Sequence, residues 1–398
     1  MEHVHRGVWA AVLVAVTGSI GFSISFTYLA LYFNTVRGLS MMAAGTIIFI
    51  SGMLSGVFQV IGGALADRFG HRKMLFVYLL LQLSALLVLT ILIATESVLW
   101  VVIIFSVLVP MTSGPIMATH SAIIADFSQD THLAESFGLV AIADNIGWAI
   151  GPLAGGYLLK TGSYAWLFGV ALLVDSISLV GVALIPKSSD HPDPERLSFN
   201  TVKSLLGNST LVIFSIISVT FFLVMAQWGS TLSVFTIDRV GFSTEEYGWL
   251  MAISGILIVV FQHPISRRLE WLGLRKALVL GCVFYGVGFL LFSWFDSFLP
   301  ATLAVVIIVI GEMLFMPSVL AAVGRMSKPE DRGKNMGFFG LFSTLGISLG
   351  PLLGGFLLDR YPASTLALWG TIAFMALLGA TGFTVWKGYL HMYEEQAV

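Results

Sequence analysis

The chain has 398 residues, of which 57% are hydrophobic and 11% are charged, and its formal net charge is −2 at pH 7. A soluble domain has about 25% charged residues, so this composition excludes an ordinary soluble protein and indicates one that lies in a membrane. The single cysteine, Cys282, excludes a disulfide framework.

Runs of about 20 apolar residues predict helices that cross a bilayer. The first run is longer than the core of a signal peptide, so we interpret it as a retained helix. We predict an all-α membrane protein with twelve transmembrane helices, six in a bundle at residues 1–186 and six in a bundle at 211–398, joined by a cytoplasmic linker at 187–210. The approximate spans are 8–34, 41–66, 74–94, 98–124, 136–159, 164–185, 211–236, 246–265, 277–296, 299–323, 336–358 and 364–386.

Basic residues are distributed unevenly between the predicted loops. With the N-terminus in the cytoplasm, sixteen of the 20 Lys and Arg residues lie on the cytoplasmic side, and only Arg37, Lys160, Arg239 and Arg360 lie on the other. Cytoplasmic loops of membrane proteins carry an excess of Lys and Arg. We therefore predict a multi-pass protein of the cell membrane with both termini in the cytoplasm.

Two motifs occur in both halves of the chain. Residues 62–73 (GGALADRFGHRK) have a degraded counterpart at 265–276, and the pattern Gly-x-x-x-Gly-Pro-x-x-Gly-Gly at 147–156 recurs at 346–355. Internal repeats in a membrane chain are typical of alternating-access transporters. Because the equivalent loops lie on the same side of the membrane, the two pseudo-symmetric halves are predicted to be related by an axis along the membrane normal.

With these two motifs and its twelve predicted spans, the sequence resembles the major facilitator superfamily over essentially the whole chain. The segment 63–72 is similar to motif A of that superfamily, and the segment 147–156 is similar to motif C, which is associated with its drug:proton antiporter branch. The resemblance implies the twelve-helix fold of the superfamily and favours multidrug efflux as the function.

The first motif combines an acid, basic residues and glycines at the membrane interface. Asp67 and the nearby Arg68 and Arg72 can form ion pairs that hold one conformation closed and separate in another. Gly63 and Gly70 permit a close approach and a tight turn. If the arginines only anchored the helix ends at the cytoplasmic side of the membrane, Asp67 would not be required. We therefore predict that this motif gates the transporter.

The second motif places small residues at intervals of four, which lets helices pack backbone to backbone. Its prolines remove a hydrogen-bond donor and bend their helices. Because both halves carry the motif, it indicates packing more strongly than it indicates antiport. The predicted packing residues are Gly147, Gly151, Pro152, Gly155 and Gly156 in the first copy, with Gly350 and Pro351 in the second.

Acidic residues are scarce inside the predicted spans: only Asp144, Asp175 and Glu312 lie well inside them, and no Lys or Arg does. A carboxylate at a helix centre costs roughly 2.5–3.5 kcal/mol on insertion scales. Burial disfavours the charged form of a carboxyl group, so such groups can bind and release protons near neutral pH. We predict proton coupling at all three, with Asp175 the weakest candidate because Ser176 or Ser178 could bind it locally.

His120 lies on the span next to Asp144 at a similar depth. A histidine–carboxylate relay is one hypothesis for it, and a structural histidine with a local hydrogen bond is the other. The fourth span also lacks the buried arginine of many relatives, since residues 102–110 read VIIFSVLVP. Mechanisms that depend on that arginine are therefore in doubt for this chain.

The resemblance implies substrate contacts near the membrane midplane from the first, fourth, seventh and tenth spans. Tyr28 and Tyr32 in the first span and Gln227 and Trp228 in the seventh are the candidates. Aromatic groups with few fixed polar groups suit variable amphipathic ligands, and acids beside aromatic rings suit cations. Ordinary core or lipid-facing packing is the alternative for residues of these types.

The sequence thus predicts a monomeric secondary transporter that exports small amphipathic, neutral or cationic compounds in exchange for protons. No cofactor, metal or nucleic acid is expected, and the sequence has neither a phosphate-binding Gly-x-x-x-x-Gly-Lys-Ser/Thr motif nor a His-Glu-x-x-His motif of an enzyme. A symporter or facilitator that imports a nutrient such as a sugar is one alternative. A sensor or lipid scramblase on the same scaffold is another.

Overall fold

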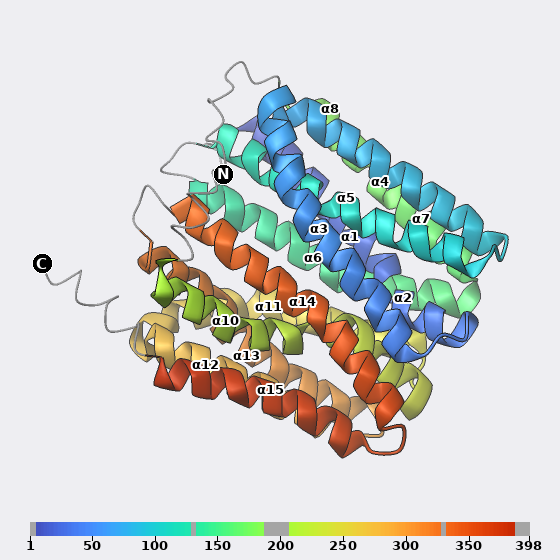
Figure 1. Ribbon diagram of the computed structural model, residues 1–398, viewed down its shortest axis with the longest axis vertical. Helices are drawn as coiled ribbons and strands as arrows, with labels where there is room; N and C mark the ends of the chain where they lie inside the picture. The colour runs from blue at the N-terminus through green and yellow to red at the C-terminus, as the bar shows by residue number, and fades with distance from the viewer. Residues whose placement is uncertain (1–4, 129–132, 187–206, 328–331, 387–398) are drawn as a thin grey trace, which may run out of the picture. The chain divides into compact units, whose positions relative to one another are not determined.

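The computed structural model describes residues 5–128, 133–186, 207–327 and 332–386, and the regular structure in these ranges is helical (Figure 1). The helices of the first half are α1 (Arg6–Phe26), α2 (Leu29–Leu31), the π-helical turn η1 (Tyr32–Val36), α3 (Met41–Phe69), α4 (His71–Ala94), α5 (Leu99–Asp126), α6 (Leu133–Thr161), α7 (Tyr164–Ser176) and α8 (Ser178–Leu184). Those of the second half are α10 (Ser209–Met225), the π-helical turns η3 (Trp228–Leu232) and η4 (Phe235–Val240), α11 (Thr244–Leu272), α12 (Leu274–Leu291), α13 (Phe298–Arg325), α14 (Arg332–Arg360) and α15 (Thr365–Val385).

Within the described ranges, twelve helical segments are long and apolar enough to cross a membrane. This confirms the predicted number of spans. Three of the segments are interrupted, since the first consists of α1, α2 and η1, the sixth consists of α7 and α8, and the seventh continues from α10 into η3. The predicted linker falls largely in residues 187–206, which lie outside the described residues.

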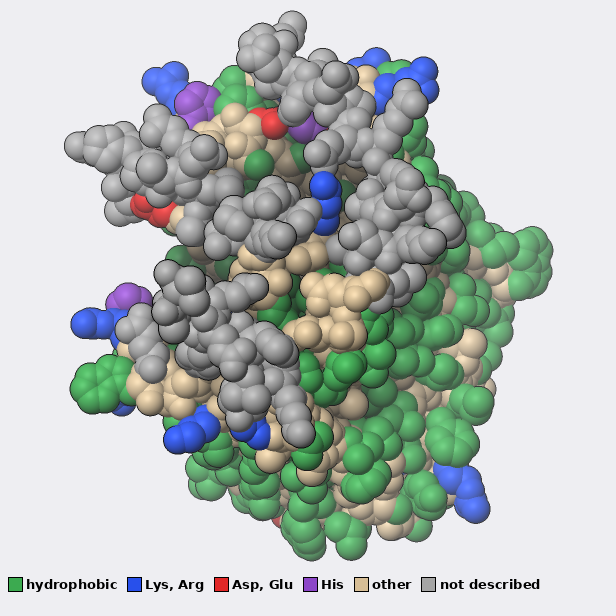
Figure 2. Space-filling view, turned by 60° about the vertical axis from the view of Figure 1, so that its left-hand side comes forward, with side chains coloured by type: hydrophobic (Ala, Val, Ile, Leu, Met, Phe, Trp, Pro, Cys, Tyr) green, Lys and Arg blue, Asp and Glu red, His purple; other side chains and the backbone are tan. Residues whose placement is uncertain are grey.

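Apolar side chains cover much of the described surface on the face shown in Figure 2, where Lys and Arg are sparse. Trp166, Leu299 and Val385 are 68%, 71% and 73% exposed. Soluble monomers rarely leave large apolar patches in contact with water, and the hydrocarbon of a bilayer solvates such side chains. The protein is therefore an integral, multi-pass membrane protein.

The helices form two compact units, which comprise residues 1–39, 46–196 and 236–255 in unit 1 and residues 40–45, 197–235 and 256–398 in unit 2. Both units use the same helix pairs. In unit 1, α1 packs on α6 and α7, and α4 packs on α5; in unit 2, α10 packs on α14 and α15, and α12 packs on α13. The repeated sequence motifs therefore correspond to a repeated packing arrangement.

A glycine with a positive φ angle makes the tight turn between the second and third spans of each half. Gly70 has a φ of 96° and Gly273 has a φ of 79°, which side chains with a Cβ rarely adopt. The arginine two residues later donates to the carbonyl groups at the end of the sixth span of its half, as Arg72 does to Ala183 (3.0 Å) and Arg275 does to Phe383 (3.3 Å). The degraded second copy of the motif has kept this role.

Candidate functional site

The first copy of the glycine motif brings α6 against α1. A Cβ atom on Gly147 would lie 2.5 Å from the Cβ of Ser19, so only glycine allows this approach. The Ser23 hydroxyl donates to the carbonyl of Gly147 at 2.9 Å, and the Tyr28 hydroxyl donates to the carbonyl of Pro152 at 2.6 Å. Small residues and hydroxyl groups together hold the two helices in contact.

The second copy brings α14 against α10 in the same way. A Cβ atom on Gly346 would lie 2.7 Å from the Cβ of Phe222, and one on Gly350 would lie 2.5 Å from the Cβ of Ala226. Here the Gln227 amide donates to the carbonyl of Gly350 at 3.0 Å. The packing role predicted for the motif agrees with the observed contacts in both units.

Asp144 lies beside this packed interface in unit 1, where it is partly buried. The Ser19 hydroxyl of α1 donates to its Oδ1 at 2.5 Å. His120 lies near enough to interact electrostatically with Asp144, but its Nε2 donates to the carbonyl of Ala11 at 2.8 Å. In the described part of the chain no hydrogen bond joins His120 to Asp144, so this conformation contains the structural histidine and not the direct relay.

Glu312 lies on α13 in unit 2 and takes part in a chain of hydrogen bonds. The Tyr285 hydroxyl of α12 donates to its Oε2 at 3.0 Å, and the Trp228 indole N–H donates to the Tyr285 oxygen at 2.9 Å. Phe221 and Phe289 pack against the Tyr285 ring, with centroids 4.7 and 5.8 Å away. An acid bonded to a tyrosine of an aromatic cluster can bind either a proton or an organic cation.

Asp175, the third predicted acid, is 1% exposed inside unit 1. The Gln82 amide of α4 donates to its Oδ2 at 2.9 Å, and the Ser178 hydroxyl lies 3.4 Å from its Oδ1 and 2.7 Å from the Thr17 hydroxyl of α1. Asp175 therefore joins three helices through buried hydrogen bonds. Of the two local partners expected for it, Ser178 contacts it, whereas Ser176 bonds to the carbonyl of Leu173.

The predicted substrate residues all lie where the first span of each half is interrupted. In the first half α1 ends at Phe26 and α2 begins at Leu29, and in the second half α10 ends at Met225 and η3 begins at Trp228. The candidates are buried there: Tyr28 and Gln227 are 0% exposed, Tyr32 is 2% exposed and Trp228 is 9% exposed. In this conformation these side chains pack the interrupted spans, and their role in substrate binding stays a prediction.

The first motif also differs in detail from its prediction. Asp67 contacts His71 at 3.1 Å, while Arg72 bonds to backbone carbonyl groups and Arg68 lies 5.2 Å from the centroid of the Phe69 ring. The close helix approach occurs at Gly62, where a Cβ would lie 2.5 Å from that of Pro115, since at Gly63 it would make an ordinary 3.7 Å contact with Ala118. In this conformation the observed partner of Asp67 is therefore a histidine, and the gating role of the motif stays a prediction.

Several partners of the predicted residues were not found by sequence reasoning. Ser19, Gln82 and Tyr285 contact the three membrane acids. Gln82 could have been identified from the sequence, because it is a polar amide inside the apolar run of residues 79–89. Ser and Tyr are common in membrane helices and carry no such signal. No group of three His, Cys, Asp or Glu residues suited to a metal ion occurs among the described residues.

Comparisons with known proteins agree with this architecture. A family model described as Major Facilitator Superfamily matches residues 11–245 and 217–391. The chain is 23% identical to the uncharacterized MFS-type transporter YqjV of Bacillus subtilis over 95% of this chain and 93% of that protein. It is 27% identical to the class C tetracycline resistance protein of Escherichia coli over 81% and 80% of the two chains. A crystal structure of the peptide transporter POT in complex with sulfate has the same fold, with a TM-score of 0.79, 18% identity and coverage of 96% and 94%.

Proposed function

Because the chain belongs to the Major Facilitator Superfamily and is a secondary transporter, not an enzyme, we propose that it exports small amphipathic, neutral or cationic compounds in exchange for protons. The observation that carries this proposal is the placement of one partly buried acid beside hydroxyl donors in each unit, Asp144 with Ser19 and Glu312 with Tyr285. Similarity to proteins named for tetracycline and multidrug resistance supports export.

The two acids supply the proposed coupling. Protonation of Asp144 and Glu312 removes two charges from an apolar environment and favours one access state, whereas the ionised forms favour a bound cation in the other. The hydroxyl donors stabilise the ionised forms, because a hydrogen bond to a charged group is stronger than one between neutral groups. Each acid can therefore alternate between a proton and a cation during the cycle.

The aromatic groups around Glu312 determine which compounds fit. Phe221, Phe289 and Tyr285 form a buried cluster of rings next to this acid, and the described interior of the spans holds no lysine or arginine that would attract an anion. Cations are attracted to aromatic faces, and flat apolar molecules stack on them. We assign this transport to a monomer in the cell membrane with both termini in the cytoplasm.

Transport by the purified protein in proteoliposomes with an imposed pH gradient tests the proposal. The wild type is expected to move a lipophilic cation such as tetraphenylphosphonium against the direction of proton flow. The double variant Asp144→Asn, Glu312→Gln is expected to lose this movement, and Asp296→Asn, which changes an exposed loop acid, is the matched control. Unaltered coupled transport by the double variant would contradict the assignment of the two acids.

Two further measurements separate the other functions of this scaffold. Proton movement in the same direction as the compound would indicate a symporter. Absence of counterflow of a labelled compound that raises the thermal stability of the protein would indicate a sensor, because a ligand stabilises whichever state binds it whether or not it is transported. A thermal-shift screen against a broad panel of compounds supplies the ligand for both measurements.

A further inference from the structure

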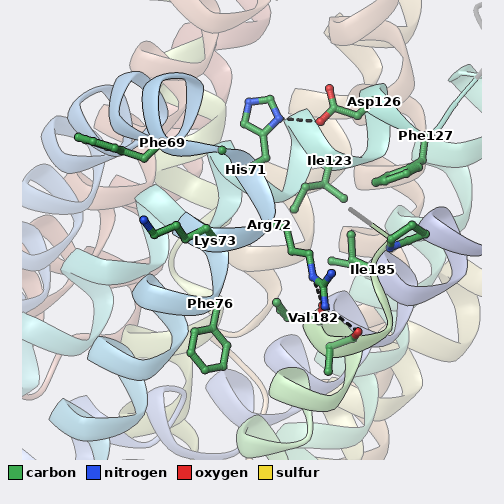
Figure 3. A pocket seen from close by; sticks show the side chains of 13 residues that line it. Phe69, His71, Arg72, Lys73, Phe76, Ile123, Asp126, Phe127, Val182 and Ile185 are labelled. Carbon is green, nitrogen blue, oxygen red and sulfur yellow. Dashed lines mark hydrogen bonds and ion pairs between the residues drawn. The ribbon is translucent and has the colours of Figure 1, made fainter. Parts of the chain in front are cut away.

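His71 lies between the carboxylate groups of Asp126 and Asp67 at one end of unit 1, and Figure 3 shows its contact with Asp126. Its Nδ1 is 2.6 Å from Oδ2 of Asp126, and its Nε2 is 3.1 Å from Oδ1 of Asp67. The three residues come from the first residue of α4, the last residue of α5 and the end of α3. The imidazole ring therefore connects the ends of three consecutive spans.

The geometry also defines the number of protons in this group. An ionised carboxylate only accepts hydrogen bonds, and a neutral imidazole has one donor and one acceptor nitrogen. Both contacts are hydrogen bonds at the same time only if the ring is the doubly protonated imidazolium. The arrangement as a whole thus contains one proton more than a neutral histidine with two carboxylates.

We propose that His71 is a proton-binding site that senses the pH of the cytoplasm, separate from the acids inside the membrane, and that its proton locks the ends of α3, α4 and α5 together. The effect on transport rests on the function proposed above. In the second half, Leu274 is the first residue of α12, as His71 is of α4. The sensor is therefore present in one half only.

The site is open to protons from solution. A cavity of about 500 Å³ is lined by His71, Asp126, Arg72 and Lys73 together with apolar side chains such as Phe76. The side chains of His71, Asp126 and Asp67 are 11%, 18% and 46% exposed, so the ring is mostly enclosed while Asp67 reaches solvent. A proton can reach the ring without passing through the membrane.

The other charged groups around the ring do not replace its proton. Arg72 on α4 donates to the carbonyl groups of Val182 and Ala183 at the end of α8 (Figure 3). Arg68 on α3 lies over the Phe69 ring, and Lys73 on α4 is exposed. Among the residues that the structure describes, Asp67 on α3 and Asp126 on α5 are the acids that face the ring, and the imidazolium is the cation between them.

The sign of the effect follows from these bonds. At low cytoplasmic pH the imidazolium donates to both carboxylates, and the three helix ends are held together. As the pH rises, the ring loses one proton, the unprotonated nitrogen faces a carboxylate oxygen, and one of the two bonds is lost. If the cycle requires these ends to separate, transport is slower at low cytoplasmic pH even without a pH gradient.

Three variants test the site in the full-length protein reconstituted in lipid. His71→Arg keeps a permanent charge with several donors, and His71→Gln keeps one donor that does not titrate. His263→Gln, which changes an exposed histidine of α11, is the matched control. The first measurement is hydrogen–deuterium exchange of the segment 66–74 at pH 6 and pH 8, corrected for intrinsic exchange. The second is counterflow of a labelled compound with equal pH on both faces.

In the wild type and the His263→Gln variant, exchange of this segment is expected to be roughly tenfold faster at pH 8 than at pH 6, as the loss of one charge-assisted hydrogen bond implies. His71→Arg is expected to stay slow and His71→Gln to stay fast at both pH values. Counterflow should lose part of its pH dependence in both His71 variants. Equal pH dependence in the wild type and in His71→Arg overturns the proposal. If the wild type shows the exchange difference but no counterflow with any stabilising compound, the proton site stands and the proposed transport function fails.

Discussion

The interface of α1 with α6 and the interface of α10 with α14 use one packing solution, yet only the first contains a carboxyl group. In both, glycines admit the backbone of the neighbouring helix, and a polar side chain donates to a glycine carbonyl, from Ser23 to Gly147 and from Gln227 to Gly350. Where Gly147 packs on Ser19, the partner of Asp144, Gly346 packs on Phe222.

This difference separates packing from chemistry. Ser343 stands 199 residues after Asp144, the offset that relates the two glycine motifs, and its hydroxyl bonds within its own helix to the carbonyl of Gly340. The glycines are thus a requirement of the fold in both units, whereas the ionisable group belongs to one. Unit 2 carries its acid on another helix, where Glu312 meets Tyr285.

The largest effect is expected when Asp144 of the first interface is replaced by serine, which is the residue at the equivalent position, Ser343, in the second half. Asp144→Ser should reduce proton-driven transport to background and leave thermal stability unchanged or higher, because removal of a partly buried charge also removes its desolvation cost. Proteoliposome flux and the unfolding temperature of the same preparation check this. Ser343→Ala, with normal flux, is the control; retained coupled flux in Asp144→Ser would show that the acid is not needed.

Substitutions that disturb the glycine packing common to the two interfaces should destabilise both units to a similar extent. Gly147→Ala places a Cβ 2.5 Å from that of Ser19, and Gly346→Ala places one 2.7 Å from that of Phe222, so each should destabilise the protein by about 1–3 kcal/mol through overpacking. Thermal unfolding in detergent measures this. Gly337→Ala, where no atom lies within 4 Å of the new Cβ, should be neutral or stabilising. A neutral Gly147→Ala would contradict the packing role.

Asp175 provides a further test, because its carboxyl group lies in a network of buried hydrogen bonds with an amide and a hydroxyl group. Asp175→Leu removes the acceptor of the Gln82 amide and of the Ser178 hydroxyl, and unsatisfied buried donors should cost about 1–3 kcal/mol of stability. Transport per folded molecule should persist, as scored by flux normalised to the folded fraction. If Asp175→Asn folded normally but lost coupling, Asp175 would belong with Asp144 and Glu312.

The smallest effect is expected at another equivalent pair, Lys160 and Asp359, 199 residues apart. Asp359 accepts from the backbone N–H groups of Met41 and Met42 at 3.0 and 2.7 Å, which caps α3 within unit 2, whereas the exposed Lys160 pairs with Glu245 at 2.7 Å within unit 1. Loss of a helix cap costs about 1 kcal/mol, and an ion pair whose lysine reaches solvent contributes less. Asp359→Ala should therefore lower the unfolding temperature measurably, and Lys160→Gln should not; the reverse order would contradict this account.

Sequence reasoning identified the parts of the site that depend on composition and repetition. Apolar runs predicted all twelve spans, the repeat predicted the equivalent interfaces, and the rarity of charges inside the spans identified Asp144, Asp175 and Glu312. Their partners could not be predicted, because a serine or tyrosine in a membrane helix is common and its facing residue depends on helix rotation. The helix contacts of Tyr28 and Gln227 could not be predicted for the same reason, since polarity does not reveal whether a side chain faces a neighbouring helix or a ligand.

Twelve membrane-spanning helices in two related halves can be predicted from the sequence alone, because the bilayer requires long apolar helices and the duplication left its glycines in place. The contacts of each polar group inside the membrane depend on how the helices pack. The three acids inside the spans have different surroundings. Asp144 accepts from a single hydroxyl group, Glu312 accepts from a tyrosine that packs among aromatic rings, and Asp175 lies in a network of an amide and hydroxyl groups. The physical reason is that a buried carboxyl group acquires its properties from the donors and dielectric around it, and packing of distant segments sets both.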